Sequence, residues 1–302
     1  MRHKTTYRYD IEVGYARCSL RLVPRPTSGQ TLLQSNIVIL PRPAFETAQR
    51  DKFSNPSMAV VITTPHRELV VESFCLVDVF ALPPSDSAHS VTWETVRASG
   101  LEHQSLQADG PALFLHPTRA TPYVPAIAEF ARESFQPGRP VLVAAGQLSR
   151  RLKAGLVYDP CATEVHTPVQ TAFEQRRGVC QDFAHIMICA LRGLGLPARY
   201  VSGYIRTSPA PGQPRQEGAD ATHAWVELWC GQSLGWVGVD PTNDLFTGDE
   251  HIVLAIGRDY HDVAPIEGVL LGAGRQTLKV EVDVHEQGEG LGPGVDLARS
   301  RA

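Results

Sequence analysis

One cysteine of this chain stands where a thiol could act as a nucleophile. Cys180 follows the turn-forming Gly178 and opens a segment whose apolar residues recur at three- and four-residue steps, the period of an amphipathic helix. Unpaired N–H groups and the positive dipole end of a first helical turn favour a thiolate. We therefore predict chemistry at Cys180, although a lone intracellular cysteine is more often a small buried hydrophobic residue. Cys189 lies nine residues after Cys180. At about 100° per residue it projects from the opposite face of the helix, so it is interpreted as a packing residue.

A cysteine nucleophile needs a base, and the base needs a partner that holds its orientation. His223 and Asp240 lie on two segments that alternate apolar and polar residues, as half-buried strands do, and a turn-like stretch at 231–235 separates them. In a hairpin the apolar faces must coincide. The pairs that this requires are Val226 with Val239 and Leu228 with Val237. His223 and Asp240 then share the other face, directly across or on a diagonal, which predicts a hydrogen-bonded pair.

The face predicted for His223 also carries three of the four tryptophans, Trp225, Trp229 and Trp236. A surface hairpin with a wetted polar face is the plainer alternative. Three indoles suit the wall of a covered cleft better, so we expect Trp225 to contribute to substrate binding.

The order of cysteine, histidine and aspartate, on a helix and two adjacent strands, resembles the papain-like core of the transglutaminase-like superfamily. The motifs that carry the resemblance are Gly178-Val-Cys-Gln-Asp-Phe-Ala-His185, Leu191-Arg-Gly-Leu-Gly-Leu-Pro-Ala-Arg-Tyr-Val-Ser-Gly-Tyr204, His223-Ala-Trp-Val-Glu227, Asp240-Pro-Thr-Asn243 and Gly257-Arg-Asp-Tyr260. Leu20-Arg-Leu-Val-Pro-Arg25 is similar to the N-terminal β-region of the bacterial family. The resemblance implies that Cys180 is the nucleophile, His223 the base and Asp240 its orienter.

The predicted fold class is α+β. Residues 4–80 form short strands separated by turn residues, as in an antiparallel β-domain, and residues 81–117 are rich in boundary-type residues. Helices are expected over Pro140–Lys153 and from Thr167-Pro168 onward. The predicted domains are an N-terminal β-rich domain at 1–110, a papain-like or transglutaminase-like core with an antiparallel sheet at 111–285, and a flexible tail at 286–302.

Composition narrows the class of partner. The 302 residues are 43% hydrophobic and 20% charged, with a formal net charge of −4, which gives no electrostatic reason to expect nucleic acid or an anionic membrane. Six cysteines without a Cys-x-x-Cys pair, no apolar leader and no membrane-length apolar run predict a cytoplasmic protein. The histidines do not cluster at ligand spacing, so we expect neither a metal nor another cofactor.

The predicted chemistry passes through a thioester on Cys180, formed from a carboxamide or peptide carbonyl of a peptide or protein substrate. The backbone N–H of Cys180 supplies one oxyanion donor, and Gln147, Tyr158 and Gln181 are chemical possibilities for the second. The Pro- and Gly-rich stretch from Thr207 to Asp220 is a candidate lid or substrate rim. A disordered insertion without such a role is an equal alternative.

Three functions share these residues. Water as the second nucleophile gives a peptidase or amidase, which we favour, and an amine gives a protein-glutamine acyltransferase. A catalytically silent peptide-binding module is the third. The sequence leaves the oligomeric state open.

Overall fold

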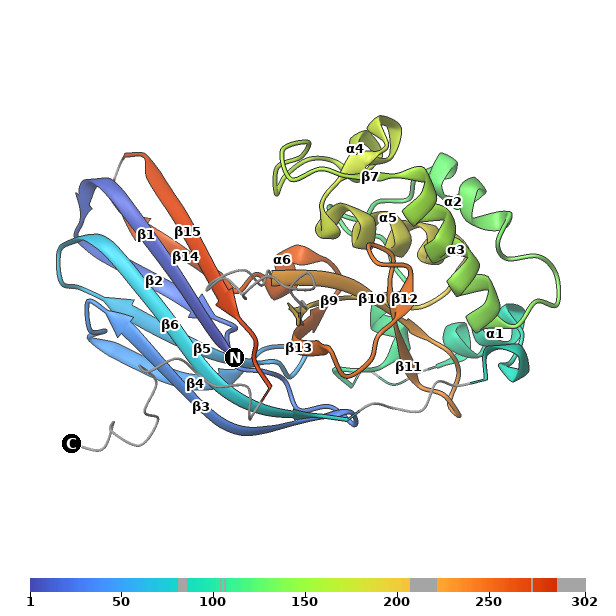
Figure 1. The fold of residues 1–302 in the computed structure, drawn as a ribbon, viewed down its shortest axis with the longest axis horizontal. Coiled ribbons are helices and arrows are strands. Elements are labelled where there is room, and N and C mark those ends of the chain that lie inside the picture. Colours follow the sequence, from blue (N-terminus) through green and yellow to red (C-terminus); the bar gives the residue numbers. More distant parts are fainter. Residues whose placement is uncertain (81–85, 104, 106, 207–221, 273, 287–302) are drawn as a thin grey trace, which may run out of the picture.

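The computed structural model describes residues 1–80, 86–103, 105, 107–206, 222–272 and 274–286. Figure 1 shows two regions, one built of strands and the other of a sheet covered by helices. The structure confirms an α+β protein in which an N-terminal antiparallel β-domain precedes a papain-like core. Among the described helices, none is both long and apolar enough to cross a bilayer.

The N-terminal region is a sandwich of two four-stranded sheets, with strand orders β15-β1-β6-β3 and β14-β2-β5-β4. Its strands are β1 (Arg2–Val13), β2 (Tyr15–Leu20), β3 (Gln30–Leu40), β4 (Phe45–Arg50), β5 (Pro56–Ile62), β6 (His66–Val79), β14 (Ile266–Leu271) and β15 (Gln276–Asp283). Alternation along the strands turns one row of apolar side chains inward. Leu20 and Ile62 of one sheet meet Leu69 and Val71 of the other in a shared core.

Two C-terminal strands correct the predicted domain boundary. Residues 266–283 were expected within the core, but β14 pairs with β2 and β15 pairs with β1, both antiparallel. These strands therefore complete the sandwich. The unpredicted strand β4 is exposed along its whole length, so it offers no apolar alternation for a sequence pattern to detect.

The core region holds a five-stranded antiparallel sheet of order β12-β11-β10-β9-β13. Its strands are β9 (Ala198–Ile205), β10 (Thr222–Trp229), β11 (Trp236–Asp240), β12 (Leu245–Phe246) and β13 (His251–Gly257). The helices and short elements around it are η1 (Ser87–His89), α1 (Trp93–Glu102), η2 (Pro111–Phe114), α2 (Pro125–Arg132), α3 (Val141–Gly155), β7 (Val157–Tyr158), α4 (Val169–Gln175), β8 (Arg177–Gly178), α5 (Cys180–Gly193) and α6 (Tyr260–Val263).

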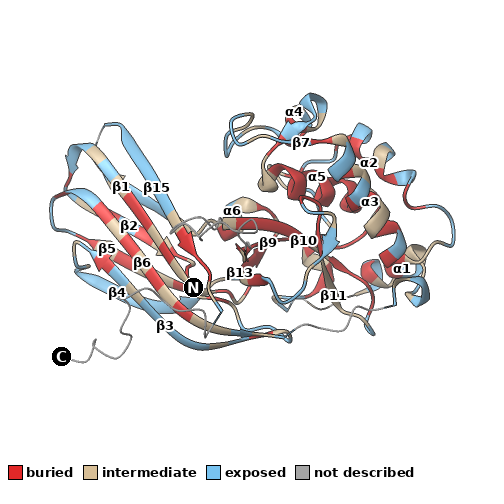
Figure 2. Ribbon diagram, in the orientation of Figure 1, coloured by how far each residue is buried: buried red, intermediate tan, exposed pale blue. Residues whose placement is uncertain are grey.

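Helix α5 lies at the centre of this region. Every residue from Asp182 to Arg192 is buried, as the red ribbon of α5 in Figure 2 shows. The apolar period predicted an amphipathic helix with one covered stripe. The helix is instead enclosed, because β9 and β10 contact it together with α2, α3 and α4. The helices predicted at Pro140–Lys153 and after Thr167-Pro168 are confirmed as α3 and α4.

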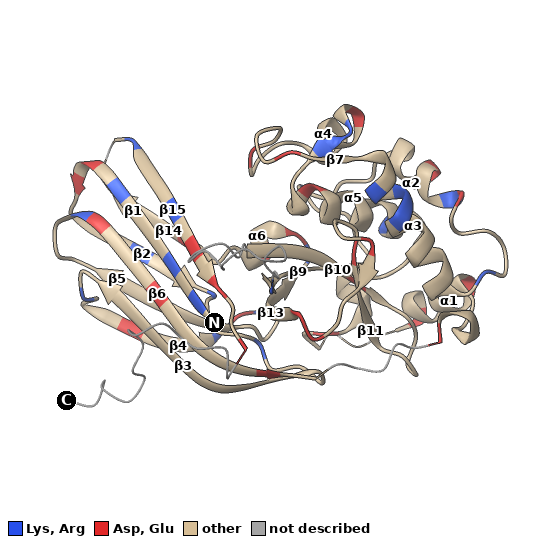
Figure 3. Ribbon diagram, viewed as in Figure 1, with Lys and Arg blue, Asp and Glu red and all other residues tan. Residues whose placement is uncertain are grey.

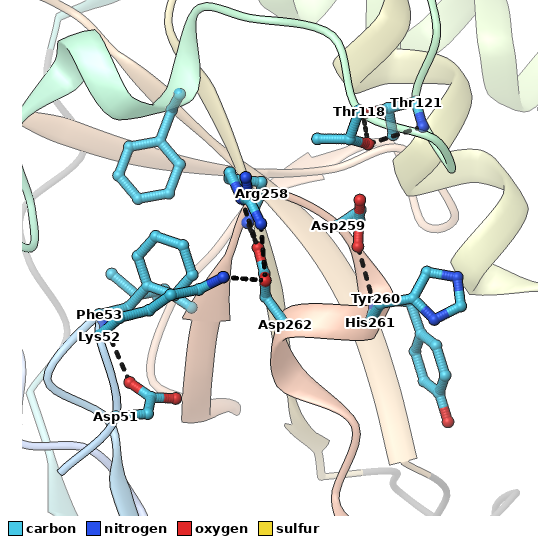
Figure 4. A network of polar contacts seen from close by, with 12 residues as sticks. Asp51, Lys52, Phe53, Thr118, Thr121, Arg258, Asp259, Tyr260, His261 and Asp262 are labelled. Atoms are coloured by element: carbon cyan, nitrogen blue, oxygen red, sulfur yellow. Dashed lines mark hydrogen bonds and ion pairs between the residues drawn. The ribbon is translucent and has the colours of Figure 1, made fainter. Parts of the chain in front are cut away.

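The two regions are joined by buried amides and by an ion pair between an exposed lysine and an aspartate whose side chain is 8% exposed. Gln30 and Asn55 of the sandwich are 2% and 0% exposed, and each bonds a backbone position of β13. In Figure 4, Lys52 and Arg258 point at the same Asp262 carboxylate, with contacts of 2.8 Å each. Charges of both signs are interspersed along the described ribbon in Figure 3.

Candidate active site

Cys180 is the first residue of α5, as predicted, and is partly buried. The turn before it is held by Asp182, whose Oδ2 accepts hydrogen bonds from the Val179 N–H at 2.8 Å and the Thr163 hydroxyl at 2.6 Å. A Cβ at Gly178 would collide with the same carboxylate, so this position requires glycine. At the first helical position, the N–H of Cys180 lies outside the intrahelical hydrogen-bond ladder.

The hairpin that carries the other two predicted residues has the expected register. Val226 pairs with Val239 and Leu228 with Val237, which confirms the argument from coincident apolar faces. The His223 Nε2 lies 2.7 Å from Asp240 Oδ2, on the diagonal of the ladder. The hydrogen-bonded pair predicted from alternation is therefore present.

The Asp240 carboxylate is fully buried and surrounded by donors. Its Oδ1 accepts from the backbone N–H groups of Thr242 at 2.9 Å and Asn243 at 3.3 Å. Its Oδ2 accepts from the Asn243 side chain at 2.7 Å as well as from His223. Burial alone raises the pKa of Asp240, but hydrogen bonds led by those from His223 and His251 hold it well below its usual range. The carboxylate is therefore charged at neutral pH.

The imidazole of His223 connects the carboxylate to the thiol. Burial lowers the pKa of His223, but hydrogen bonds and charge interactions with Asp240 and Cys180 outweigh burial and raise the pKa to about 9. Because Nε2 faces Asp240, Nδ1 is the ring nitrogen left for the sulfur. The ring is protonated at neutral pH, the form that can donate a proton to a leaving group.

His251 is a member of this cluster that the sequence analysis missed. Its Nε2 lies 3.4 Å from Asp240 Oδ2, and the side chain is 4% exposed. The Gly248 N–H donates to Nδ1 at 3.5 Å, which places the ring proton on Nε2, toward the carboxylate. The available signal was a histidine at the start of a strand eleven residues after Asp240, which has no meaning until the sheet order is known.

His223, Asp240 and His251 also offer three ligand-type atoms within 4.8 Å of one another. These are the residues that could hold a divalent cation. The Asp240 Oδ2 already accepts hydrogen bonds from two side chains at 2.7 Å, so the arrangement is complete as a hydrogen-bond network. The absence of a metal stays a prediction.

Two buried side chains of α5 differ sharply from Cys180. Cys189 is 2% exposed, and burial raises the pKa of its thiol to about 12, which agrees with its interpretation as packing. His185 accepts a hydrogen bond from the Tyr260 N–H at 3.2 Å, and burial lowers its pKa to about 4. Neither group has the environment of a nucleophile or a base.

The remaining candidates for the second oxyanion donor are Tyr158, Gln181 and Gln147. Tyr158 is 48% exposed and pairs through its backbone with Gly178. Burial raises the pKa of Tyr158, and a charge interaction with Cys180 adds to the effect. Gln181 donates its amide to the Val165 carbonyl at 3.0 Å, and Gln147 accepts from Arg139. Both amides are thus engaged elsewhere.

The tryptophan face corrects the prediction of a cleft wall. Trp225 is 1% exposed and packs with Phe53 and Phe114, and Trp229 is 4% exposed. The η2 segment and a loop of the sandwich cover this face. Trp225 is therefore a buried packing residue and does not line a substrate cleft. Its ring lies 5.2 Å from that of His251. The candidate lid at 207–220 lies outside the described residues.

A helix that presents a cysteine beside a sheet that presents a histidine and an aspartate defines a papain-like core. Residues 1–78 match the bacterial transglutaminase-like N-terminal region, and residues 128–241 match the transglutaminase-like superfamily. An uncharacterized protein of Mycobacterium tuberculosis is 38% identical over 289 residues, covering 93% of this chain and 90% of the relative. The chain therefore belongs to the transglutaminase-like superfamily, in its bacterial form with the N-terminal region.

Two further relatives are similar to parts or to the fold of the chain. A protein-glutamine γ-glutamyltransferase of Pseudomonas aeruginosa is 32% identical over 128 residues, which is 42% of this chain and 19% of that protein. A Cytophaga hutchinsonii structure described as that of a candidate cysteine protease superposes with a TM-score of 0.66 at 18% identity. The match covers 95% of this chain and 92% of that structure.

Proposed function

We propose that this protein is a cysteine peptidase or amidase that acts on a peptide or protein through a thioester on Cys180. The observation that carries the proposal is the continuous contact from the thiol through His223 to the buried Asp240 carboxylate. A protonated imidazole beside the sulfur stabilises a thiolate, and the carboxylate stabilises the imidazolium.

In the first half-reaction the thiolate adds to the carbonyl carbon. The C–N bond then breaks as the His223 imidazolium gives its proton to the leaving nitrogen, and a thioester remains on Cys180. In the second half-reaction water attacks the thioester while His223 takes a proton from it. The C–S bond breaks and the carboxylic acid leaves. The Cys180 N–H donates to the oxyanion in both steps, and Tyr158 is the remaining candidate for a second donor.

Hydrolysis is favoured over amine transfer by the carboxylates around the helix start. Asp182 accepts bonds from Val179 and Thr163, and Asp159 lies 3.2 Å from Arg177. Both are thus engaged within the protein and offer no ready counter-charge to an incoming ammonium group. Acyl transfer to an amine is the second candidate, because part of the core is similar to a relative named as a γ-glutamyltransferase.

Competitive alkylation tests the nucleophile. Brief treatment with limiting iodoacetamide from pH 5.5 to 9, followed by peptide mapping, compares Cys180 with Cys161, an exposed thiol of the same chain. We expect Cys180 to react many times faster than Cys161 at pH 6, and His223→Ala to abolish that advantage. His166→Ala, at an exposed histidine, is the matched control and should leave it unchanged. Equal rates at Cys180 and Cys161 in the wild type would contradict the proposal.

A glutamine-containing peptide then separates the two reactions. Incubation without added amine should give peptide cleavage or ammonia release if water is the second nucleophile. Incubation with a labelled primary amine should give little incorporation. Dominant amine incorporation would favour the acyltransferase, and a reactive Cys180 with neither product would favour a binding module.

A further inference from the structure

Strand β13 has two different neighbours. One edge pairs with β9, and the register shifts between Val253 and Ala255, where a bulge interrupts the ladder. The other edge faces the sandwich rather than another strand of the same sheet. An edge strand exposes backbone groups that need partners, and bulges near active sites often re-aim a side chain.

Two buried amides of the sandwich supply those partners. Gln30 donates to the Val253 carbonyl at 2.8 Å and accepts from the Val253 N–H at 2.8 Å. Asn55 makes the same two bonds with Ile256, at 2.8 and 2.9 Å. Each carboxamide thus presents one donor and one acceptor to a strand position, as a neighbouring strand would. The sandwich therefore holds β13 along its otherwise open edge.

The strand that is held in this way begins with His251. Val253, whose backbone N–H and carbonyl bond the Gln30 side chain, is two positions after His251. Among the residues that the structure describes, the other protein donors to the Asp240 carboxylate are His223 and the turn residues Thr242 and Asn243, two and three positions after Asp240. His251 is thus the donor that ties the carboxylate to the edge of the sheet.

We propose that the N-terminal sandwich positions the catalytic carboxylate. Gln30 holds β13 at Val253, β13 holds His251, and the Nε2–H of His251 holds Asp240 in the orientation that accepts from His223. Gln30 and His251 are therefore positioning residues that act through Asp240, from two different regions of the molecule. This inference rests on the proposed function of Cys180, His223 and Asp240.

The test uses the rate of Cys180 alkylation by iodoacetamide on the full-length chain across pH 5.5 to 9. His251→Ala should lower the rate at pH 6 about tenfold and change the pH profile, because the Asp240–His223 pair loses its fixed geometry. His251→Gln should restore most of the rate, since its amide can donate to Asp240 where Nε2 did. A purely structural role of His251 would change stability without moving the pH profile.

A double-mutant cycle tests the route from the sandwich. Gln30→Met should lower the Cys180 rate several-fold, and Gln30→Met combined with His251→Ala should lower it no further than His251→Ala alone, because both act on one path. Lys52→Met, which removes an interface contact to α6 rather than to β13, is the matched control and should leave the Cys180 rate unchanged. If the Gln30→Met variant does not fold, the Gln30→Glu variant takes its place in the cycle, because it keeps the acceptor for the Val253 N–H.

The outcomes are distinguishable. Multiplicative effects of the Gln30 and His251 substitutions, or an unchanged rate in His251→Ala, would overturn the inference. Either result would leave the proposed function intact as long as wild-type Cys180 still reacts faster than Cys161. A wild-type Cys180 without that advantage would instead overturn the proposed function itself.

Discussion

The sandwich and the core each bury a histidine, and the pKa of the two imidazoles shifts in opposite directions. His3 of the sandwich bonds the Tyr204 hydroxyl at 2.6 Å and the Thr5 hydroxyl at 2.8 Å, and burial lowers its pKa to about 4. His223 of the core is similarly buried, yet its pKa rises to about 9 because of Asp240 and Cys180. Desolvation disfavours the imidazolium in both places. A buried carboxylate partner reverses the outcome, while a neutral hydroxyl does not.

Replacing that carboxylate should make His223 resemble His3, and this is the largest effect that we expect. In Asp240→Asn burial persists while the negative charge is gone and only the interaction with Cys180 still favours the imidazolium, so the pKa of His223 should fall well below about 9. The rate of Cys180 alkylation at pH 6 should fall about 100-fold or more. Asp259→Asn, at another buried aspartate, is the control and should stay near the wild-type rate. A wild-type rate in Asp240→Asn would contradict the role of the carboxylate.

The raised pKa of His223 predicts a loss of stability on the alkaline side. A group whose pKa is raised by folding stabilises the native state fully below its ordinary pKa of about 6.5, and that contribution disappears as the pH rises through about 9. The free energy of unfolding should therefore fall by up to roughly 3 kcal/mol across this window. Urea titrations of the wild type and Asp240→Asn measure it. The alkaline loss should be largely absent in Asp240→Asn, and parallel curves would refute the linkage.

The lowered pKa of His3 predicts the opposite pH dependence. Its neutral form is bonded in the native state, so its contribution is present above about pH 6.5 and is lost as the pH falls through about 4. His3→Gln, which can still bond both hydroxyls, should flatten the acid side of the stability profile by up to roughly 3 kcal/mol. The alkaline side should be unchanged, and an altered alkaline side would show that the two regions do not titrate independently.

The contacts between the two regions should contribute very unequally. Asn55→Ala leaves the Ile256 backbone groups buried without partners, which should cost about 2 kcal/mol of unfolding free energy. Lys52→Met removes an ion pair whose lysine side chain is 60% exposed, and the expected cost is less than about 1 kcal/mol. Urea midpoints at matched pH provide the comparison. A larger loss in Lys52→Met would mean that the ion pair, rather than the amides, joins the regions.

Local pattern was enough where one constraint settled the structure. The register of β10 on β11 follows from two rows of apolar residues that must face the same way, and a slip of one residue would put the two rows on opposite faces of the hairpin. The start of α5 at Cys180 follows from the glycine turn and the helical period. These two features placed His223 beside Asp240 and the thiol at a helix terminus.

Local sequence pattern did not predict contacts between segments that lie far apart in the chain. The strands β14 and β15 pair with β2 and β1, and nothing in their local sequence states that they return to the N-terminal region. Trp225 reads as the wall of a cleft because the residues that cover it, Phe53 and Phe114, come from distant segments. His251 was missed for the same reason.

The amino-acid sequence by itself determined which side chains could perform thiol chemistry and the local geometry that offers each of them, because helix and strand periods depend on neighbouring residues. Only the tertiary structure decided the charge state of His223, the burial of Asp240 and the contact of His251 with it. Those properties depend on desolvation and on partners contributed by separate strands, and neither is written in any one stretch of the chain.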